Sequence, residues 1–365
     1  MNELKKCMIK AIILLVTSIF IMVSFFPQFL MRISSPKLNQ VDLIPEESYF
    51  PNYLKYEDKE KDLKWLPNDT LNASYYIHPQ KRTTIIEPYV PQTMIIEDEK
   101  GIANSTTKIL IICHSAVENF MERTTIRETW GSAMDSLPIM LIFILGKTKN
   151  PLIQRKIHNE ALLNNDLLQE NFIDTYDNLS LKSVFMLKYL KFLNDSHIDI
   201  KFILKIDDDC YLNPNSLFKF SFIAEKHPFT IFGKSLGPNS PVHRLINSNE
   251  TSDNKWTVPK YVYSNDFFPN AISGSGYFFD IEAGLCLYRR SLDTSLINLE
   301  DIYITGILRE RCDINLINIS RFHFMGKKIC SIKRSDILIH HVKNPQKMYI
   351  IHELVNGITK CRKEP

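Results

Sequence analysis

Residues 201–214 read KFILKIDDDCYLNP and join an apolar run to three consecutive acids. The apolar half is typical of a buried strand, and Asp207, Asp208 and Asp209 follow where that strand would end. Adjacent carboxylates repel one another, and a bound divalent cation removes the repulsion while gaining the oxygen ligands that hard cations prefer. A solvated acidic turn is the simpler alternative, but apolar residues on both sides indicate a partly buried position. We therefore predict a metal site at the end of this strand.

The segments before this stretch alternate between strand-like and helix-like patterns. Residues 108–115 (KILIICHS) and 139–146 (IMLIFILG) are predicted strands. The predicted helices are a stretch that ends at Gly131, residues 152–170 and residues 179–193. Strands that alternate with helices indicate an α/β fold with an open sheet, whose ligand crevice lies at the carboxyl ends of the strands.

Residues 11–31 read AIILLVTSIFIMVSFFPQFLM and contain no charged side chain. This length is what a helix needs to cross a bilayer, and Lys5, Lys6 and Lys10 place the short N-terminus on the cytoplasmic side. A cleaved signal peptide has a shorter apolar run and a small-residue cleavage site, and a buried core helix is rarely apolar on every face. We predict a cytoplasmic tail over 1–10 and a transmembrane signal anchor over 11–31, which makes a single-pass type II membrane protein.

Residues 32–107 are rich in proline, tyrosine, asparagine and charge, without a sustained helical or alternating period. They predict a luminal stem. A small extra subdomain is the alternative, but seven prolines between Pro36 and Pro91 argue against regular structure. A catalytic domain over 108–356 and a C-terminal tail over 357–365 follow.

The composition narrows the class of protein. The formal net charge is only +3 and no long basic block occurs, which excludes a nucleic-acid partner. Six cysteines lie beyond the predicted anchor and allow fifteen pairings, and none has a zinc-site spacing, so disulfides or buried thiols are expected. These cysteines are Cys113, Cys210, Cys286, Cys312, Cys330 and Cys361. Candidate N-glycosylation sites are Asn68, Asn72, Asn104, Asn178, Asn194, Asn249 and Asn318.

Five separated segments resemble, in order, the motifs of the β1,3-glycosyltransferase family that includes β1,3-galactosyltransferases, β1,3-N-acetylglucosaminyltransferases and Fringe. They are RTTIRETWG (123–131), DTYDNLSLKS (174–183), KIDDDCYLNP (205–214), SGSGYFFD (273–280) and EDIYITG (300–306). The resemblance covers roughly residues 108–355. It implies a GT-A fold, in which a Rossmann-like nucleotide-binding half joins an acceptor-binding half. It also implies a UDP-sugar donor and, usually, Mn²⁺.

The resemblance implies roles for the acids and for a late histidine. Asp209 would ligate the metal, while Asp207 and Asp208 would hold the donor ribose or waters. His341 matches the position that completes the metal site, with His340 as the adjacent alternative, and a neutral imidazole suits Mn²⁺ beside a carboxylate.

The resemblance also assigns the general base to Asp301. A sugar hydroxyl is a poor nucleophile, and a carboxylate within hydrogen-bond reach can take its proton as attack develops. A single displacement would invert the sugar, so no covalent intermediate is needed. Glu300 and Asp301 could at the same time begin a helix, where acids favour the dipole.

Further positions are predicted to contact substrates. Arg127, Lys182 and Lys205 match basic positions that would bind the donor, although each could instead be a structural ion-pair partner. The predicted donor and acceptor cleft contains Trp256, Gly274, Gly276 and Glu300, and the glycines admit close backbone approach. Ala271 and Ile272 stand where many relatives have Tyr-Cys. The pairing of Cys286 is therefore left open.

The sequence thus predicts an inverting enzyme of the Golgi membrane, with its catalytic domain luminal. It would transfer galactose, or else an N-acetylhexosamine, from a UDP-sugar to O3 of a terminal sugar on a glycoprotein or glycolipid glycan. A β1,3-N-acetylglucosaminyltransferase and a catalytically silent glycan-binding or chaperone relative are the alternatives. A homo- or hetero-oligomer is compatible with the sequence.

Overall fold

The computed structural model describes residues 63–91, 96–98, 101–103, 108–244, 255–323, 328–340, 342 and 344–360. The predicted cytoplasmic tail and anchor lie outside these residues, as do Asn104, Asn249 and His341. Within the described ranges, no helix combines the length and the apolar character that crossing a membrane requires.

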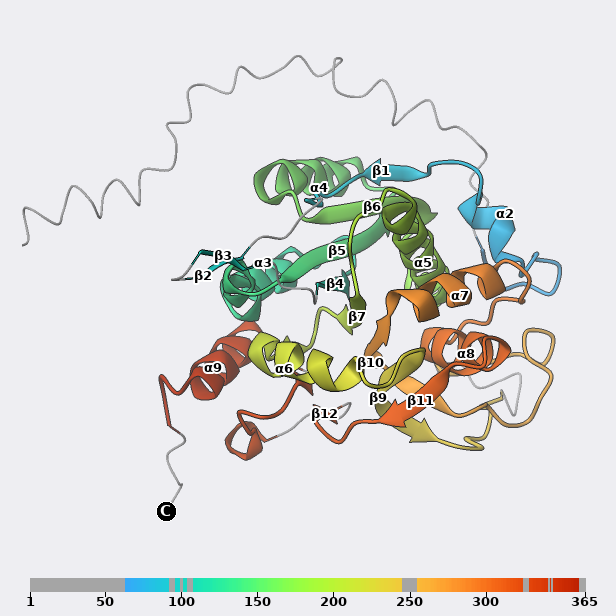
Figure 1. Cartoon of the computed structure of the whole chain (residues 1–365). Helices are drawn as coiled ribbons and strands as arrows, with labels where there is room; N and C mark the ends of the chain where they lie inside the picture. The colour runs from blue at the N-terminus through green and yellow to red at the C-terminus, as the bar shows by residue number, and fades with distance from the viewer. Residues whose placement is uncertain are drawn as a thin grey trace, which may run out of the picture. The chain divides into compact units, whose positions relative to one another are not determined.

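An eight-stranded sheet forms the centre of the fold (Figure 1). Its order is β1 (Thr84–Ile86), β6 (Leu167–Ile173), β5 (Ile139–Lys147), β4 (Ile109–His114), β7 (Phe202–Asp207), β10 (Ala271–Asp280), β9 (Thr230–Gly237) and β11 (Asn315–Asn318). Strands β6, β5, β4 and β7 are parallel, β10 is antiparallel to both of its neighbours, and β11 is parallel to β9. This mixed α/β sheet fits the predicted fold class.

Helices cover both faces of the sheet. They are α2 (Ala73–Ile77), α3 (Phe120–Glu128), η1 (Trp130–Ser136), α4 (Pro151–Asn164), η2 (Tyr176–Asn178), α5 (Leu179–Asp195), α6 (Pro214–Ala224), α7 (Ile281–Ser291), η3 (Ile302–Leu308), α8 (Arg309–Arg311), η4 (Ile329–Ser331) and α9 (Pro345–Asn356). Leu110 and Ile112 of β4 join the core under α5 and α7, whereas Ile109 and Ile111 join the core under α3, α4, α6 and α9. Because both faces are buried, the central strands read as continuous apolar runs.

Three helices begin in the same way. Asn150, Asn213 and Asn344 each accept a hydrogen bond from a backbone N–H of the first turn, and each is followed by proline. Asparagine satisfies N–H groups that the helix leaves without partners, and proline at the first position lacks the N–H that would need one.

The helix predicted over 152–170 is wrong for its last six residues. Helix α4 ends at Asn164, where Asn165 adopts a left-handed conformation, and β6 begins at Leu167. Asparagine is one of the few residues that accept this conformation cheaply, so it stops the helix as glycine often does.

Two short sheets lie beside the main one. The first joins β12 (Phe322–His323), β13 (Leu338–Ile339) and β8 (Tyr211–Leu212), and the second pairs β2 (Ile96–Asp98) with β3 (Gly101–Ala103). In the first sheet Leu338 pairs with Leu212 and Ile339 with Tyr211. This pairing brings the C-terminal segment next to the acidic cluster.

The prediction of a stem without regular structure is wrong for residues 63–91. Strand β1 extends the main sheet, and Leu63, Tyr76 and Ile77 are buried in the core that α5 covers. The apolar residues of this segment are scattered among prolines and follow neither a helical nor an alternating pattern. Their burial becomes visible only in the structure, where they pack against α5. This segment therefore belongs to the same compact unit as the main sheet.

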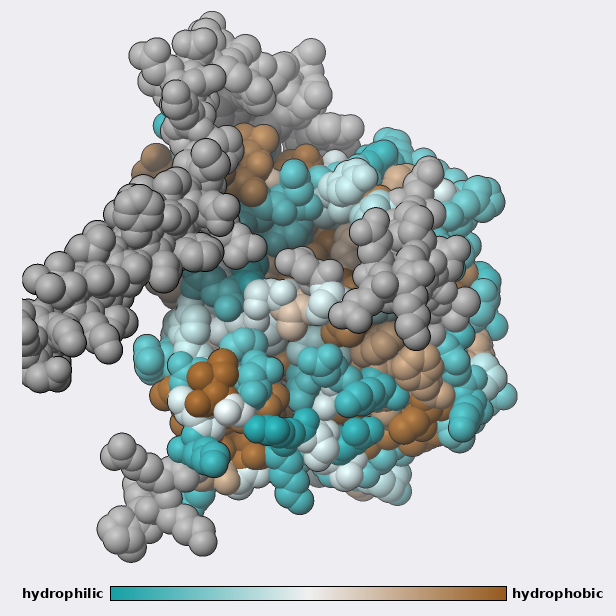
Figure 2. All heavy atoms as spheres, turned by 60° about the vertical axis from the view of Figure 1, so that its left-hand side comes forward, coloured by the Kyte–Doolittle hydropathy of each residue, from teal (hydrophilic) through white to brown (hydrophobic). Residues whose placement is uncertain are grey.

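On the face that Figure 2 shows, hydrophobic residues form separate patches among hydrophilic ones. This is the side that carries α3 and α9 in Figure 1. Scattered apolar residues are ordinary on a globular surface. We therefore assign no partner to this face.

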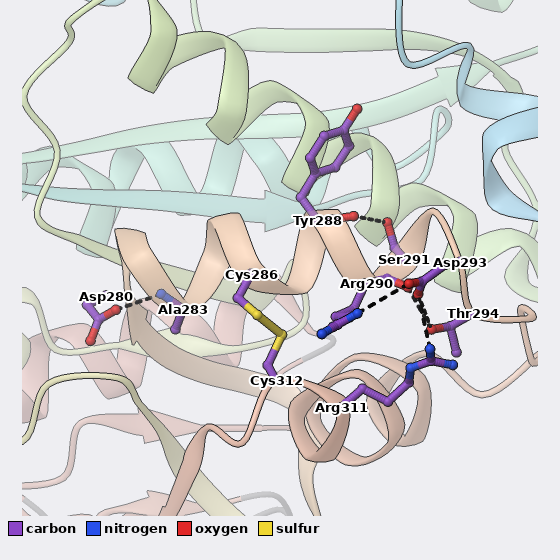
Figure 3. Close-up of a disulfide and its surroundings, with 10 residues drawn as sticks. All are labelled: Asp280, Ala283, Cys286, Tyr288, Arg290, Ser291, Asp293, Thr294, Arg311 and Cys312. Carbon is purple, nitrogen blue, oxygen red and sulfur yellow. Dashed lines mark hydrogen bonds and ion pairs between the residues drawn. A yellow bond between two sulfur atoms is a disulfide. The ribbon is translucent and has the colours of Figure 1, made fainter.

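Cys286 forms a disulfide with Cys312 (Figure 3). Cys286 lies on α7, and Cys312 follows α8, so the bond joins α7 to the far end of the helical segment that starts at Asp301. The structure settles the pairing that the sequence left open. Cys330 is also disulfide-bonded, whereas Cys113 and Cys210 are buried free thiols.

Replacing Cys286 with alanine is expected to lower the free energy of unfolding by about 3 kcal/mol, because the bond closes a loop of 26 residues in the unfolded chain. Urea denaturation of the full chain measures the change. Cys113→Ala, which removes a free thiol, is the control for loss of buried side-chain volume. Equal midpoints for the Cys286→Ala variant and the unchanged protein would contradict a stabilising role.

Candidate active site

The acidic cluster lies where the strand order reverses. Strands β5 and β6 follow β4 on one side, and β7 returns on its other side. His114, the last residue of β4, pairs in register with Asp207, the last residue of β7. Open α/β sheets bind ligands in the crevice outside such a reversal, at the carboxyl ends of the strands. The acids therefore stand at the expected ligand site.

Lys205 holds Asp207 in place. Its Nζ lies 2.6 Å from Asp207 Oδ1, 3.6 Å from Glu300 Oε2, and 2.5 Å from the Gly274 carbonyl oxygen, to which it donates. Burial opposes the charge of this lysine, but the charges of Asp207 and Glu300 raise its pKa above the usual value. Lys205 therefore joins the acidic cluster to the second pair of acids.

Asp208 points toward the segment after β4. It accepts a hydrogen bond from Asn119 Nδ2 at 2.9 Å and a further one from the Ser115 side chain. Burial raises the pKa of Asp208 to about 6 despite these bonds. The sequence did not predict a role for Asn119 or Ser115, because no recognisable motif assigns one to either residue.

Asp209, Cys210 and His340 form a compact group of three ligand types. His340 Nε2 lies 3.1 Å from Asp209 Oδ1, and Cys210 Sγ lies 3.8 Å from the same oxygen. One ligand atom from each residue lies within 4.8 Å of the others. This donor set fits a divalent cation. His340, the alternative to His341, is thus the histidine that the described residues bring to Asp209.

Glu300 and Asp301 stand across from the acidic cluster, before η3. Buried Glu300 accepts hydrogen bonds from Ser183 Oγ at 2.5 Å and from Tyr277 OH at 2.7 Å. Asp301 is partly exposed, and its two oxygens accept from Ile302 N at 2.9 Å and Gly274 N at 3.3 Å. Burial, then the charge of Glu300, raises the pKa of Asp301 to about 6. Asp301 is the member of the pair that solvent reaches more freely.

The glycines of the SGSG segment allow close packing within the site. A Cβ on Gly274 would lie 3.2 Å from Glu300 Oε2 and 3.4 Å from Asp301 Cβ. A Cβ on Gly276 would lie 2.4 Å from Leu338 Cδ1. The chain's own side chains approach the strand here, so a side chain at either glycine would require these neighbours to shift.

The donor-binding role predicted for Arg127 is wrong. Its guanidinium makes a two-pronged ion pair with Asp166 at 2.7 and 2.8 Å and a further one with Glu160 at 2.8 Å. Asp166 directly precedes β6, and Glu160 lies on α4 and also pairs with Arg123, so the cluster joins α3 to α4 and to the start of β6. The structure places Arg127 in the alternative role of an ion-pair partner.

Lys182 lies at the crevice but is already paired. Its Nζ is 2.7 Å from Asp174 Oδ1 and donates to the Ser115 carbonyl oxygen at 2.9 Å. Buried His114 lies nearby, and its ring nitrogens have no hydrogen-bond partner among the described residues. Burial and the charges of Lys205 and Lys182 hold the pKa of His114 well below its usual value. Lys182 therefore connects Asp174 to the Ser115 backbone at the edge of the crevice.

Trp256 is 54% exposed, as a sugar-stacking residue should be. Lys255 Nζ lies 5.1 Å from the centres of both the Trp256 and Tyr176 rings. Burial and the charges of Asp301 and Asp207 raise the pKa of Tyr176, which links this aromatic surface to the acids. The sequence singled out Trp256 but missed Tyr176.

The structure also separates the candidate glycosylation sites. Asn68, Asn72, Asn194 and Asn318 are exposed. Asn178 is buried, and its Nδ2, the atom that a glycan would occupy, donates to the Ile173 carbonyl oxygen at 3.0 Å. The prediction for Asn178 is therefore wrong.

An open α/β sheet with acids at its switch point and a second acid pair facing them defines an α/β enzyme that acts on a ligand in this crevice. Residues 121–320, more than half of the 365-residue chain, match the family model described as galactosyltransferase. The chain therefore belongs to the galactosyltransferase family and is a glycosyltransferase.

Curated relatives agree with this assignment. The chain is 28% identical to beta-1,3-galactosyltransferase 1 of Homo sapiens and of Mus musculus over 278 residues, which cover 74% of this chain and 80% of each relative. It is 28% identical to beta-1,3-galactosyltransferase 2 of Homo sapiens over 291 residues, which cover 77% of this chain and 66% of that protein.

Solved structures are more distant. One is a glycosyltransferase involved in glycosylation of the major capsid of PBCV-1, with 10% identity and a TM-score of 0.36, covering 68% of this chain and 99% of that one. Another is the 4-diphosphocytidyl-2C-methyl-D-erythritol synthase of Anaerococcus prevotii, with 14% identity and a TM-score of 0.35, covering 68% and 96%.

Proposed function

We propose that this enzyme transfers galactose from UDP-galactose to O3 of a terminal sugar on a glycoprotein or glycolipid glycan, with inversion. The observation that carries the proposal is the joining of the two acid systems: Lys205 contacts Asp207, Glu300 and the Gly274 carbonyl oxygen at once. The names of the curated relatives support galactose and the 3-linkage.

In this mechanism Asp301 accepts the proton of the acceptor hydroxyl. Backbone N–H groups of Ile302 and Gly274 hold its carboxylate, and Glu300 is kept away from the substrate by Ser183 and Tyr277. A base whose pKa lies near 6 is ionised at neutral pH yet still basic enough to take the proton. Asp301 therefore works as the general base, and Glu300 as the group that raises its basicity.

Asp209 and His340 would hold the divalent cation, for which the family resemblance implies Mn²⁺. When bound, such a cation supplies positive charge to the diphosphate of the departing UDP. Asp207 and Asp208, fixed by Lys205 and Asn119, remain the proposed contacts of the donor ribose or its waters. Trp256 and Tyr176 are proposed to face the sugars.

The proposed location is the Golgi membrane, with residues 11–31 as a single-pass type II anchor and the catalytic domain in the lumen. The Cys286–Cys312 disulfide supports an oxidising compartment. The exposed sequons at Asn68, Asn72 and Asn194 are compatible with it.

A catalytically silent, glycan-binding role is the rival. Such a protein needs a sugar-binding surface but no basic carboxylate beside it. The raised pKa of Asp301 and the hydrogen bonds that orient it favour an enzyme.

The test uses the full chain, purified in detergent and assayed with UDP-galactose, UDP-N-acetylglucosamine and UDP-N-acetylgalactosamine against a panel of glycan acceptors. We expect galactose transfer that EDTA abolishes and added Mn²⁺ restores, and that Asp209→Asn lowers by at least about 100-fold. Asp199→Asn, at an exposed carboxylate, is the matched control. Transfer that ignores EDTA, or none to any acceptor, would refute the proposal.

A further inference from the structure

The group Asp209, Cys210 and His340 contains a sulfur atom, which the family resemblance does not call for. Two ligands on one tetrahedral Zn²⁺, at about 2.0–2.3 Å from the ion, stand roughly 3.3–3.6 Å apart. The separations from Asp209 Oδ1 are 3.1 Å to His340 Nε2 and 3.8 Å to Cys210 Sγ. Both separations lie within a few tenths of an ångström of that range, and all three ligand atoms lie within 4.8 Å of one another.

The backbone holds these residues together without help from an ion. Val342 N donates to the Asp209 carbonyl oxygen at 2.7 Å, and the pairing of Ile339 with Tyr211 aligns the segments that carry His340 and Cys210. Buried Trp130 donates from Nε1 to the Cys210 carbonyl oxygen at 3.1 Å. The two ligand-bearing segments are therefore set in register before a cation arrives.

The thiol of Cys210 is in a reduced form that can ligate. It forms no disulfide, and Sγ donates a weak hydrogen bond to the Ser275 carbonyl oxygen at 3.3 Å. Cys113 is the other free thiol in the described ranges, and it is not part of the three-residue group. The chain thus offers a neighbouring buried cysteine as an internal comparison.

We infer that Cys210 Sγ is a third protein ligand of this metal site, so that the site binds thiophilic cations such as Zn²⁺ and Co²⁺ through sulfur. The inference rests on the proposed function only in using the same metal site. On binding, the S–H bond breaks, the proton leaves to solvent, and the sulfur electron pair binds the cation. Soft thiolate ligands favour such ions over the harder Mn²⁺.

The experiment follows metal binding rather than transfer. The full chain in detergent is freed of metal and titrated with Co²⁺, whose bond to a thiolate gives a sulfur-to-metal charge-transfer band in the near ultraviolet. We expect the band in the unchanged protein and in Cys113→Ser, and its loss in Cys210→Ser. Zn²⁺ affinity should fall on the order of 100-fold in Cys210→Ser, with Mn²⁺ affinity kept within about twofold.

A second measurement needs no variant. X-ray absorption of the Zn²⁺-loaded full chain should show one sulfur neighbour at about 2.3 Å. A zinc shell of oxygen and nitrogen alone, or a cobalt band that persists in Cys210→Ser, would overturn sulfur ligation. Galactose transfer with Mn²⁺ is measured separately. Transfer without the sulfur signal would refute this inference alone, and the signal without transfer would refute the proposed function alone.

Discussion

Replacing Asp301 with asparagine is expected to lower kcat for galactose transfer by about 10²–10⁴-fold while UDP still binds. The amide keeps the size of the side chain and an oxygen that can accept from Ile302 N, but it cannot take a proton from the acceptor hydroxyl. Steady-state transfer and UDP titration by calorimetry measure the two effects. Asp195→Asn, at the exposed end of α5, is the matched control.

The pH dependence provides a separate check on Asp301. Because burial and Glu300 raise its pKa to about 6, kcat/KM should fall tenfold per pH unit below that value and level off above it.

The raised pKa of Asp301 also makes its ionised form unfavourable in the folded state, so this group's contribution to the free energy of unfolding is lost as pH rises from about 4 to 6. At pH 7 the Asp301→Asn variant should therefore melt at the same or a higher temperature. If the Asp301→Asn variant transferred galactose at an unchanged rate, Asp301 would not be the general base.

A chain shortened to begin at Thr107 is expected to lose on the order of 5 kcal/mol or more of stability, against a total of about 5–15 kcal/mol for a typical domain. The deletion removes Leu63, Tyr76 and Ile77 from the core and strips β1 from the sheet edge. It also takes away the Thr83 and Thr84 hydroxyls that donate to buried Glu170, whose pKa burial already raises.

The matched comparison is a chain that begins at Lys59 and keeps this segment. Thermal melting and urea midpoints of the two chains measure the difference. We expect the longer chain to fold and the shorter one to aggregate or melt far lower. Equal midpoints would show that residues 63–91 only lie on the domain without stabilising it.

Much of the fold could be predicted from local patterns. The buried strands β4, β5 and β7 are recognisable in the sequence as apolar runs, and the acids at the end of β7 indicate the position of the crevice. Strand β6 was missed because its sequence, LLQENFI, carries polar residues whose burial depends on partners elsewhere in the chain. Gln169, for instance, is buried only because Gln154 and the Gly146 carbonyl oxygen satisfy its amide.

Site residues could be predicted where a local motif contains them. Contacts between residues that are distant in the sequence could not. The structure brings Asp301, Glu300 and Lys205 together around Gly274, whereas the sequence assigned Lys205 to the donor or to an ion pair without naming its partners. The prediction that Arg127 binds the donor was wrong because its ion-pair partner, Asp166, is 39 residues away in the sequence, and no local pattern predicts that pair. The Cys286–Cys312 pairing was equally hidden, since spacing alone cannot choose among six cysteines.

The contact between β8 and β13 has a consequence for biosynthesis. These strands are separated by more than a hundred residues, so the later one is synthesised well after the first. A chain still emerging from the ribosome can form the parallel strands β4 to β7 early, because domains fold as their sequence becomes available. It cannot bring His340 to Asp209 until the segment that carries β13 has been made. The proposed metal site is therefore completed later in synthesis than the strands that carry its acids.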